Sequence, residues 1–560
     1  MKIFLAQQNY HIGNIAANTQ KIIDAIEMAK QQGGDLIVFS ELSVCGYAPR
    51  DFLEFDDFIS KCTAAIEKIK QYADTIGVFV GAPDKNPVKK GKDLFNAAYF
   101  LFEKEVKAII HKTCLPNYDV FDEYRYFEPS YEWNVIEFKG KKLAVTICED
   151  IWNLGNNPMY RVCPMDELMK QQPDLMINLS ASPFDYTHLE NRKAAIKANV
   201  LKYKLPLFYC NSVGSQTEIV FDGASLVFDA AANLCGQLPK FTEALQSFVV
   251  NEDRTIEGAI IEPATRIPDK ELEPVELEEN LNISQVYAAI VMGIKDYFSK
   301  MGFSKAIIGS SGGIDSAVTL ALACDALGAD NVMAVLMPSP YSTAHSVADA
   351  EQLSCKLGNR YETIPIEKIY NSFLNELKPV FNDLPFGIAE ENIQSRTRGN
   401  LLMAIANKFG YILLNTSNKS ELATGYGTLY GDMAGGIGVL GDCYKLQVYA
   451  LAKYINRNGE IIPGNIITKA PSAELRLGQK DSDALPDYSI LDKILYQYIE
   501  RTQGPNEIKA LGFDTALVDK VLRMVNINEY KRNQFCPIIR ISPKAFGVGR
   551  RVPIVGKYLS

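Results

Sequence analysis

The sequence lacks long apolar runs and lacks an excess of positive charge. No apolar stretch in its 560 residues approaches the length needed to cross a bilayer. The apolar start at Met1–Ala6 ends at Gln7 and is too short for a signal peptide. The formal net charge is −9 and the pI is about 5.3, which argues against nucleic acid or an anionic membrane as the main partner, although a local basic pocket could still hold phosphates. We therefore expect no membrane and no nucleic acid among its partners.

The sequence also lacks a CxxC pair, although it contains 11 cysteines. An odd number of cysteines without such pairs is typical of reduced thiols and predicts a cytoplasmic location. Internal repeats and low-complexity tracts are absent as well. With 47% hydrophobic and 22% charged residues, the composition is typical of a globular protein. Because the chain is too long for one hydrophobic core, several domains are expected.

No Walker loop is present, because no Gly-Lys pair is followed by serine or threonine. The sequence instead carries the string GSSGGIDS at Gly309–Ser316, which also lacks the G-x-G-x-x-G spacing of a dinucleotide loop. An apolar strand at 306–308 precedes this string, a helix is predicted over 317–327, and a second strand over 332–337. This order predicts a βαβ unit whose glycine-rich turn leads into a helix.

Such a turn, together with the helix start, can bind phosphate oxygens through backbone N–H groups. Asp315 would be repelled by bare phosphate, so it is suited to a metal ion that rides on the phosphates. The alternative is a glycine-rich turn without a chemical role. SGGIDS resembles the pyrophosphate loop of the N-type ATP pyrophosphatases. This resemblance implies an ATP site made of Gly309, Ser310, Ser311, Gly312, Gly313, Ile314, Asp315 and Ser316.

A segment rich in glutamate and proline, Glu262–Asn280, divides the sequence into two halves. Because such a segment resists packing, we predict domains over 1–261 and 284–560 and a linker over 262–283. In the first half, strands are predicted at 2–6, 36–39, 78–80, 97–102, 143–147, 175–179, 207–209 and 225–228, and helices at 19–32, 58–72 and 189–203. This alternation predicts a layered α/β fold. The second half should form a doubly wound parallel α/β sheet with its ligand at the carboxyl ends of the strands.

Three reactive side chains of the first half, Glu41, Lys112 and Cys148, each follow an apolar strand. Together they could form a covalent catalyst, in which a thiolate attacks a carbonyl, a carboxylate moves the proton and an ammonium stabilises the oxyanion. Each alone is more often a buried or solvated residue without a catalytic role. Cys45 and Cys114 are rival nucleophiles, but only Cys148 follows a long apolar strand and precedes Glu-Asp.

The segments around these residues are FSELSVCGYAPRD (39–51), HKTCLPNY (111–118) and TICEDIW (146–152). They resemble the Glu–Lys–Cys signatures of the nitrilase or carbon–nitrogen hydrolase superfamily, in the same order and at suitable separations. The resemblance covers about residues 1–260 and implies an αββα sandwich that hydrolyses an amide. It also implies a supporting catalytic role for Glu123 in FDEYRYF.

A second glycine-rich segment, 413–445, follows another predicted strand end and contains NTSNKSELATGYGTLYGD. Its glycines allow backbone to approach a large ligand closely, and Glu421, Asp432 and Thr416 supply polar groups. This segment resembles the signatures of NAD synthetases, as do EENIQSRTRGN (390–400) and EYKRNQFCPIIRIS (529–542). The two halves together resemble the glutamine-dependent NAD synthetase family, whose second domain is an α/β fold similar to the adenine nucleotide hydrolases.

This resemblance implies a carbon–nitrogen ligase that releases ammonia from glutamine and amidates adenylated nicotinic acid adenine dinucleotide, giving NAD, AMP, pyrophosphate and glutamate. It assigns Tyr118, Ser182 and His188 to glutamine, Thr416 to ATP, and Asn392, Glu421 and Lys531 to the dinucleotide. It places Mg²⁺ on Asp315 and Glu421, and it implies a homo-oligomer. His188 departs from the Lys or Arg usual at its position, so Arg192 is an alternative contact for the glutamine carboxylate.

Two other functions are compatible with these motifs. The chain could be a glutamine-fed ATP pyrophosphatase ligase that amidates a different nucleotide or small carboxylic acid, or one half could be an inactive scaffold. The complete set of Glu41, Lys112 and Cys148 disfavours a scaffold. The segments around Asn392 and Glu421 favour the dinucleotide acid as substrate.

Overall fold

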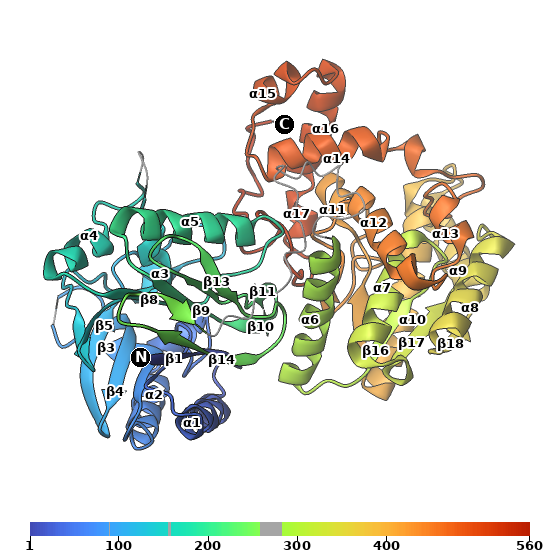
Figure 1. Ribbon diagram of the computed structural model, residues 1–560. Coiled ribbons are helices and arrows are strands. Elements are labelled where there is room, and N and C mark those ends of the chain that lie inside the picture. The colour runs from blue at the N-terminus through green and yellow to red at the C-terminus, as the bar shows by residue number, and fades with distance from the viewer. Residues whose placement is uncertain (89, 155–157, 258–282, 560) are drawn as a thin grey trace. The chain divides into compact units, whose positions relative to one another are not determined.

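The computed structural model describes residues 1–88, 90–154, 158–257 and 283–559 (Figure 1). The chain divides into two compact units, Met1–Arg266 and Ile267–Ser560. The predicted linker over 262–283 lies outside the described residues except for its last position. The exact domain limits of 261 and 284 therefore stay predictions.

The first unit contains two large sheets. The seven strands of one sheet, in spatial order, are β15 (Ile256–Glu257), β14 (Ala244–Val250), β1 (Lys2–Gln7), β2 (Leu36–Val38), β3 (Gly77–Lys85), β4 (Leu94–Phe102) and β5 (Glu105–His111). The six strands of the other are β13 (Leu234–Gln237), β12 (Leu226–Phe228), β9 (Leu207–Asn211), β8 (Leu175–Ser180), β7 (Lys141–Ile147) and β6 (Ile136–Phe138). The central strands β1–β2–β3 and β7–β8–β9 are parallel.

The two sheets pack face to face through the apolar side chains that alternate along their strands. Ile3 and Leu5 of β1 contribute to one buried cluster with Val145 of β7 and Ile177 of β8. The other face of the first sheet packs against helices α1 (Ile15–Gln31) and α2 (Asp56–Lys70). Helices α4 (Pro164–Leu168) and α5 (His188–Tyr203) cover the second sheet. These four layers confirm the predicted αββα sandwich.

Smaller elements complete the first unit. They are helix α3 (Glu123–Tyr126) and the hairpin of β10 (Val213–Gln216) and β11 (Ile219–Asp222).

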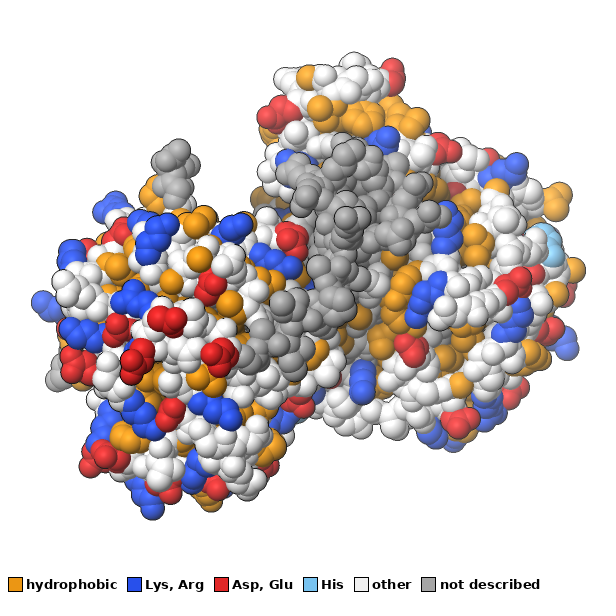
Figure 2. Space-filling view, in the orientation of Figure 1, with side chains coloured by type: hydrophobic (Ala, Val, Ile, Leu, Met, Phe, Trp, Pro, Cys, Tyr) orange, Lys and Arg blue, Asp and Glu red, His pale blue; other side chains and the backbone are white. Residues whose placement is uncertain are grey.

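On the face seen in Figure 2, acidic and basic side chains are interspersed, with no large area of one sign. Among the described residues of the whole chain, no helix combines the length and apolar character that crossing a bilayer requires.

The second unit is built on a parallel five-stranded sheet. Its strands, in spatial order, are β18 (Arg360–Thr363), β17 (Val332–Leu336), β16 (Ala306–Gly309), β19 (Ile412–Asn415) and β20 (Ile437–Gly438). Helices α6 (Ile283–Met301), α7 (Ile314–Leu327), α8 (Ala344–Leu357) and α12 (Lys445–Ile455) lie on one side, and α9 (Glu367–Phe381) and α10 (Ile388–Phe409) on the other. This arrangement confirms the predicted doubly wound sheet.

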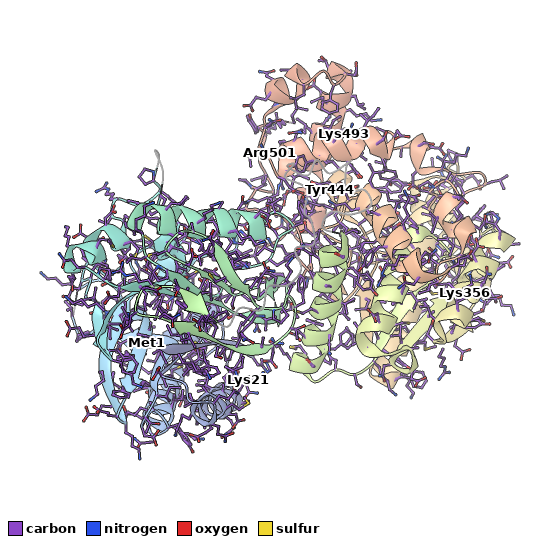
Figure 3. The ribbon with its side chains drawn as sticks, in the orientation of Figure 1. Met1, Lys21, Lys356, Tyr444, Lys493 and Arg501 are labelled. Atoms are coloured by element: carbon purple, nitrogen blue, oxygen red, sulfur yellow. The ribbon has the colours of Figure 1, made fainter. Side chains whose placement is uncertain are left out.

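The unit contains further helices, several of which form a second apolar cluster. The further helices are α11 (Lys419–Thr424), α13 (Gly464–Thr468), α14 (Tyr488–Ile499), α15 (Pro505–Ala510), α16 (Thr515–Ile527) and α17 (Glu529–Arg532). Side chains of α11, α14 and α16 form the core of the cluster, and the fully buried Tyr444 belongs to it (Figure 3). The order of the sheet changes direction between β16 and β19, which is where doubly wound proteins bind ligands.

Candidate active sites

Cys148 lies directly after the carboxyl end of β7, at the start of a 3₁₀ turn that spans Cys148–Ile151. Its φ of +42° is in the left-handed region, which a residue with a side chain adopts only where the surroundings enforce it. The side-chain amide of Asn178 donates to the Cys148 carbonyl oxygen at 3.4 Å. The sulfur is therefore presented from a sharply turned and anchored backbone rather than from the strand itself.

Lys112, the first residue after β5, brings two glutamates together. Its Nζ donates to Oε1 of Glu41 at 2.7 Å and to both carboxylate oxygens of Glu123 at 2.8 and 2.9 Å. The amide of Asn96 donates to the same two carboxylates, and the Tyr47 hydroxyl donates to Glu123 at 2.7 Å. All five side chains are buried. The result is one ammonium fixed between two carboxylates.

The turn that carries Glu41 packs closely against the neighbouring strand β3. A Cβ on Gly81 of β3 would lie 2.4 Å from the backbone nitrogen of Leu42, so only glycine permits this approach. The other carboxylate oxygen of Glu41 accepts a hydrogen bond from the backbone of Ala181, just past β8. Strand ends from both sheets therefore converge on Glu41.

The charges of this cluster shift the protonation of its members. Burial opposes the charge of Lys112, but Glu123 and Glu41 outweigh it and raise the pKa of the ammonium. Burial raises the pKa of Glu123, although Lys112 acts against this. Burial and the Glu41 carboxylate raise the pKa of the Cys148 thiol, with Lys112 opposing them. The resting cysteine is therefore a thiol that needs a base when it attacks.

The rival cysteines have other surroundings. Cys45 lies in the apolar cluster between α1, α2 and the first sheet, and its thiol donates to the Leu42 carbonyl oxygen. The Cys114 thiol is directed at the carbonyl oxygen of Val162. Burial raises the pKa of both thiols. Cys148 is the cysteine whose thiol interacts with Glu41, Lys112 and Glu123 together.

Two of the residues predicted to bind glutamine contact side chains next to Cys148, namely Tyr118 with Glu149 and His188 with Trp152. Ser182 Oγ and His188 Nε2 are 2.7 Å apart, and the His188 ring stacks on Trp152 with 5.2 Å between ring centroids. Tyr118 donates to Glu149 at 3.0 Å. The alternative contact, Arg192, is fully buried and held by Asp222 at 2.9 Å. His188 is thus the more accessible of the two candidates for a ligand carboxylate.

Glu149 was not singled out by the sequence analysis. It is buried beside Cys148, and it accepts hydrogen bonds from the hydroxyls of Tyr118 and Tyr160. Burial raises its pKa to about 7, against the lowering effect of Lys112. Its place directly after the predicted nucleophile was the available signal.

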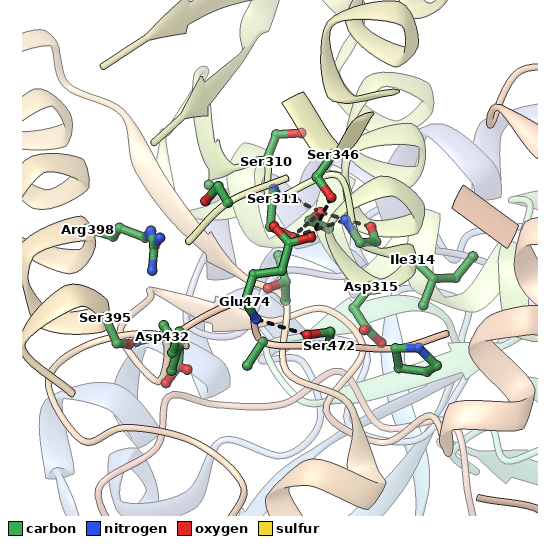
Figure 4. A pocket seen from close by; sticks show the side chains of 18 of the residues that line it. Ser310, Ser311, Ile314, Asp315, Ser346, Ser395, Arg398, Asp432, Ser472 and Glu474 are labelled. Atoms are coloured by element: carbon green, nitrogen blue, oxygen red, sulfur yellow. Dashed lines mark hydrogen bonds between the residues drawn. The ribbon is translucent and has the colours of Figure 1, made fainter. Parts of the chain in front are cut away.

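A cavity of about 550 Å³ lies in the second unit, at the carboxyl ends of β16 and β19 (Figure 4). Most of the residues predicted to bind ATP or metal line it: Gly309, Ser310, Ser311, Gly313, Ile314, Asp315, Ser316, Thr416 and Glu421. Gly312, Asn392 and Lys531 are not among its lining residues. Asn392 accepts from Thr428 at 2.7 Å, and Lys531 donates to the carbonyl oxygens of Gly425 and Gly427, so both support the adjoining glycine-rich segment.

The loop at Gly309–Ser316 has the features of an anion site. Helix α7 begins at Ile314, three residues earlier than predicted, so that Asp315 belongs to its first turn. Gly312 has a φ of +75°, and a Cβ there would lie 2.1 Å from the Ser346 carbonyl oxygen. Among the described residues, the buried hydroxyl of Ser310 has no hydrogen-bond partner. Ser310 lines the cavity, so this hydroxyl is available to a ligand oxygen.

Asp315 and Glu421 share one counter-charge in this cavity. Lys445 Nζ lies 2.6 Å from Asp315 Oδ2 and 3.4 Å from Glu421 Oε1. Burial and the neighbouring Asp315 raise the pKa of Glu421 to about 8, although Lys445 opposes this. No cluster of three or more metal-binding side chains occurs in the described part of the chain. Two carboxylates completed by phosphate oxygens and water are nevertheless a common Mg²⁺ environment, so these residues fit that ion.

The cavity wall carries further charged residues, among them Arg398 and Glu474 (Figure 4). Arg398 lines it and donates through Nε to the Met337 carbonyl oxygen, and burial lowers its pKa to about 10. The Glu474 carboxylate accepts from the hydroxyls of Thr343 and Ser346 at 2.8 and 2.7 Å. The cavity thus offers both a loop for phosphates and polar groups for a second ligand.

Comparisons with known proteins match both units. Residues 2–256 match the family described as carbon-nitrogen hydrolase, and residues 286–535 match the family described as NAD synthase. A glutamine-dependent NAD(+) synthetase of Synechocystis sp. is 42% identical, over 99% of this chain and 98% of its own. One of Acinetobacter baylyi is 41% identical with the same coverage. A solved Acinetobacter baumannii glutamine-dependent NAD+ synthetase, in complex with ADP, is 38% identical with a TM-score of 0.77, covering 99% and 98% of the two chains.

Proposed function

The chain belongs to the family of glutamine-dependent NAD synthetases, and from this premise we propose which residues carry each step of the reaction. The family reaction uses ATP to activate nicotinic acid adenine dinucleotide and glutamine to supply the nitrogen. Support for the residue roles comes chiefly from one observation, the buried contacts of Lys112 with Glu41 and Glu123 beside the Cys148 thiol.

In the first unit, Cys148 attacks the side-chain amide of glutamine. Glu41 accepts the thiol proton as the C–S bond forms, and Lys112 stabilises the tetrahedral oxyanion. Glu41 then gives the proton to the departing nitrogen, so that ammonia leaves and a γ-glutamyl thioester remains. Water, with Glu41 again as base, hydrolyses the thioester to glutamate. Glu123 keeps Lys112 charged and aligned throughout.

Glutamine is held on both sides of the sulfur. Tyr118 and Ser182 supply hydroxyl groups, and His188 faces the glutamine carboxylate. Arg192 is assigned a structural role, because its guanidinium is taken up by Asp222. A histidine contributes less positive charge near neutral pH than a lysine or arginine would, so the carboxylate is held less firmly here.

In the second unit, the nicotinate carboxylate attacks the α-phosphate of ATP, and the bond to pyrophosphate breaks. The Gly309–Ser316 loop receives the departing pyrophosphate, and Thr416 binds ATP. Asp315 and Glu421 would hold Mg²⁺, which as a Lewis acid would stabilise the negative charge on the phosphate oxygens. Ammonia then displaces AMP from the adenylate to give NAD. Asn392, Glu421 and Lys531 bind the dinucleotide. Asn392 and Lys531 do so through the glycine-rich segment that they support.

We further propose a cytoplasmic homo-oligomer with domains over 1–261 and 284–560. The reduced cysteines support the compartment, and the acidic glutamate-rich segment supports the boundary. Size measurement by light scattering would test the assembly, and limited proteolysis between the domains would test the boundary.

Replacing Cys148 with alanine tests the division of labour. We expect Cys148→Ala to lose glutamine-driven NAD synthesis, since Cys148 supplies the nucleophile, and to keep synthesis from ammonium salts. Cys114→Ala, a buried cysteine two residues from Lys112, is the matched control and should keep both activities. Both are measured as NAD formed from nicotinic acid adenine dinucleotide and ATP. Full glutamine use by Cys148→Ala would show that the nucleophile is misassigned.

A further inference from the structure

A single buried carboxylate joins the segment that carries Lys112 to the turn that carries Cys148. Oδ1 of Asp150 accepts hydrogen bonds from the backbone nitrogens of Thr113 at 3.1 Å and Cys114 at 2.8 Å. Its Oδ2 accepts one from the backbone nitrogen of Ile147 at 3.0 Å. Thr113 directly follows Lys112, and Ile147 directly precedes Cys148. One side chain therefore fixes the backbone on both sides of the reaction centre.

The fold gives this link particular importance. Lys112 follows β5 and Cys148 follows β7, and these strands belong to different sheets. No backbone hydrogen-bond ladder connects strands of facing sheets, which contact each other mainly through side-chain packing. Packing alone would let the two strand ends shift relative to each other. The Asp150 carboxylate, which belongs to the Cys148 turn, adds two directional bonds across this junction, from Thr113 and Cys114, and its third bond, from Ile147, anchors its own turn.

We propose that Asp150 is a positioning residue, which holds the Lys112 ammonium at a fixed separation from the Cys148 sulfur during glutamine hydrolysis. This inference rests on the proposed function of Cys148 and Lys112. Hydrogen bonds to an ionised acceptor are stronger than those between neutral groups, so the two bonds from the Lys112 segment and the one within the Cys148 turn define the junction well. A displacement of about 1 Å at a reacting pair can lower the rate about 100-fold.

Asp150→Asn is the variant that weakens the link with least change in volume. Its amide nitrogen replaces one of the two acceptor oxygens and cannot accept a hydrogen bond from a backbone N–H group. Either the bonds from Thr113 and Cys114 or the bond from Ile147 are therefore lost. We expect kcat for glutamine-driven synthesis to fall about 100-fold while the KM for glutamine changes little. Ammonium-driven synthesis should stay unchanged. Asp150→Ala, which removes both acceptors, should lose more than Asp150→Asn.

Asp174→Asn is the matched control, because Asp174 accepts from the backbone nitrogen of Lys142 at 2.8 Å at the opposite end of β7. This variant should keep the wild-type kcat. Folding of the first unit is followed by the fluorescence of the chain's 2 tryptophans, Trp133 and Trp152. The indole of Trp133 donates to Thr113 Oγ1 at 3.0 Å and so reports on the Lys112 segment directly.

Three results would overturn the inference. The first is a wild-type kcat in Asp150→Asn, and the second is an equal loss of glutamine-driven and ammonium-driven synthesis. The third is the absence of cooperative unfolding in both Asp150 variants, which would mean that Asp150 supports the fold rather than the reaction geometry. A wild-type protein that uses ammonium but never glutamine would instead overturn the proposed function, and this inference with it.

Discussion

Lys112→Met should show how much of the stability and activity depends on the charge of Lys112 rather than on the packing of its side chain. Methionine has nearly the length of lysine but carries no charge, so Glu41 and Glu123 remain buried without their shared cation. Removing one partner of a buried ion pair costs about 3–5 kcal/mol. For a domain of this size, that loss lowers the unfolding midpoint by about 10 °C. Glutamine-driven synthesis should disappear, and ammonium-driven synthesis should remain at a temperature where the variant is folded.

The stability loss in Lys112→Met should depend on pH, and the direction of this dependence follows from the pKa of Glu123. Burial already raises the pKa of Glu123 in the presence of Lys112, which opposes it, so removing Lys112 raises the pKa further. A carboxyl whose pKa is higher in the folded state than in the unfolded state binds its proton on folding. The destabilisation is therefore largest at high pH and disappears as the pH falls toward about 4.3, the ordinary glutamate value. Lys112→Met should be closer to the wild type at pH 5 than at pH 8.

Thermal unfolding followed by tryptophan fluorescence measures this prediction, because Trp133 and Trp152 both lie in the first unit. Lys107→Met is the matched control, since Lys107 lies on β5 and also contacts two glutamates, but in the solvent. It should unfold close to the wild type at both pH values. The double variant Lys112→Met/Glu123→Gln should regain stability without regaining glutamine use. Equal midpoints for Lys112→Met and the wild type at pH 8 would refute the reasoning.

Two further substitutions test the remaining parts of the sites. Gly312→Ala should abolish synthesis from both glutamine and ammonium, because the new Cβ would lie 2.1 Å from the Ser346 carbonyl oxygen. Steady-state kinetics with varied ATP measures this loss. Undiminished ATP use would contradict the role of the loop. His188→Ala should raise the KM for glutamine about tenfold, as expected for loss of about one hydrogen bond to a charged group, with little change in kcat. An unchanged KM for glutamine would show that a residue other than His188 binds the glutamine carboxylate.

A local pattern marks the residues that could be picked out without any resemblance to a known family. Glu41, Lys112 and Cys148 each follow an apolar strand, and the Gly309–Ser316 loop lies between a strand and a helix. Strand ends of parallel sheets gather at one edge, so a pattern read locally also predicts proximity in space. The start of α7 was predicted too late because Gly313 serves as its N-cap, and the turn before it was expected to be longer.

Other parts of the fold and the sites depend on contacts between distant segments. Strand β14 has mostly half-buried residues, so its apolar pattern is weak, and it pairs with β1 from the far end of the first unit. Asn96 bridges Glu41 and Glu123 only because β4 lies beside β3 and β5 in the sheet. A lone asparagine in an apolar strand carries no signal of such a role. These contacts follow from topology and register, which local patterns do not specify.

The two candidate sites share one electrostatic feature, a lysine between two acidic side chains. Each gathers a pair of carboxylates, buried in the first unit and half-buried in the second, and places one lysine ammonium between them, Lys112 and Lys445 respectively. Without the lysine, the pKa of one carboxylate of each pair would rise further, because two adjacent charges of one sign disfavour each other where water is largely excluded. The acids in each pair were recognisable from sequence motifs, but Lys445 was not. A predicted pair of buried carboxylates therefore implies a nearby cation, even where no motif names it.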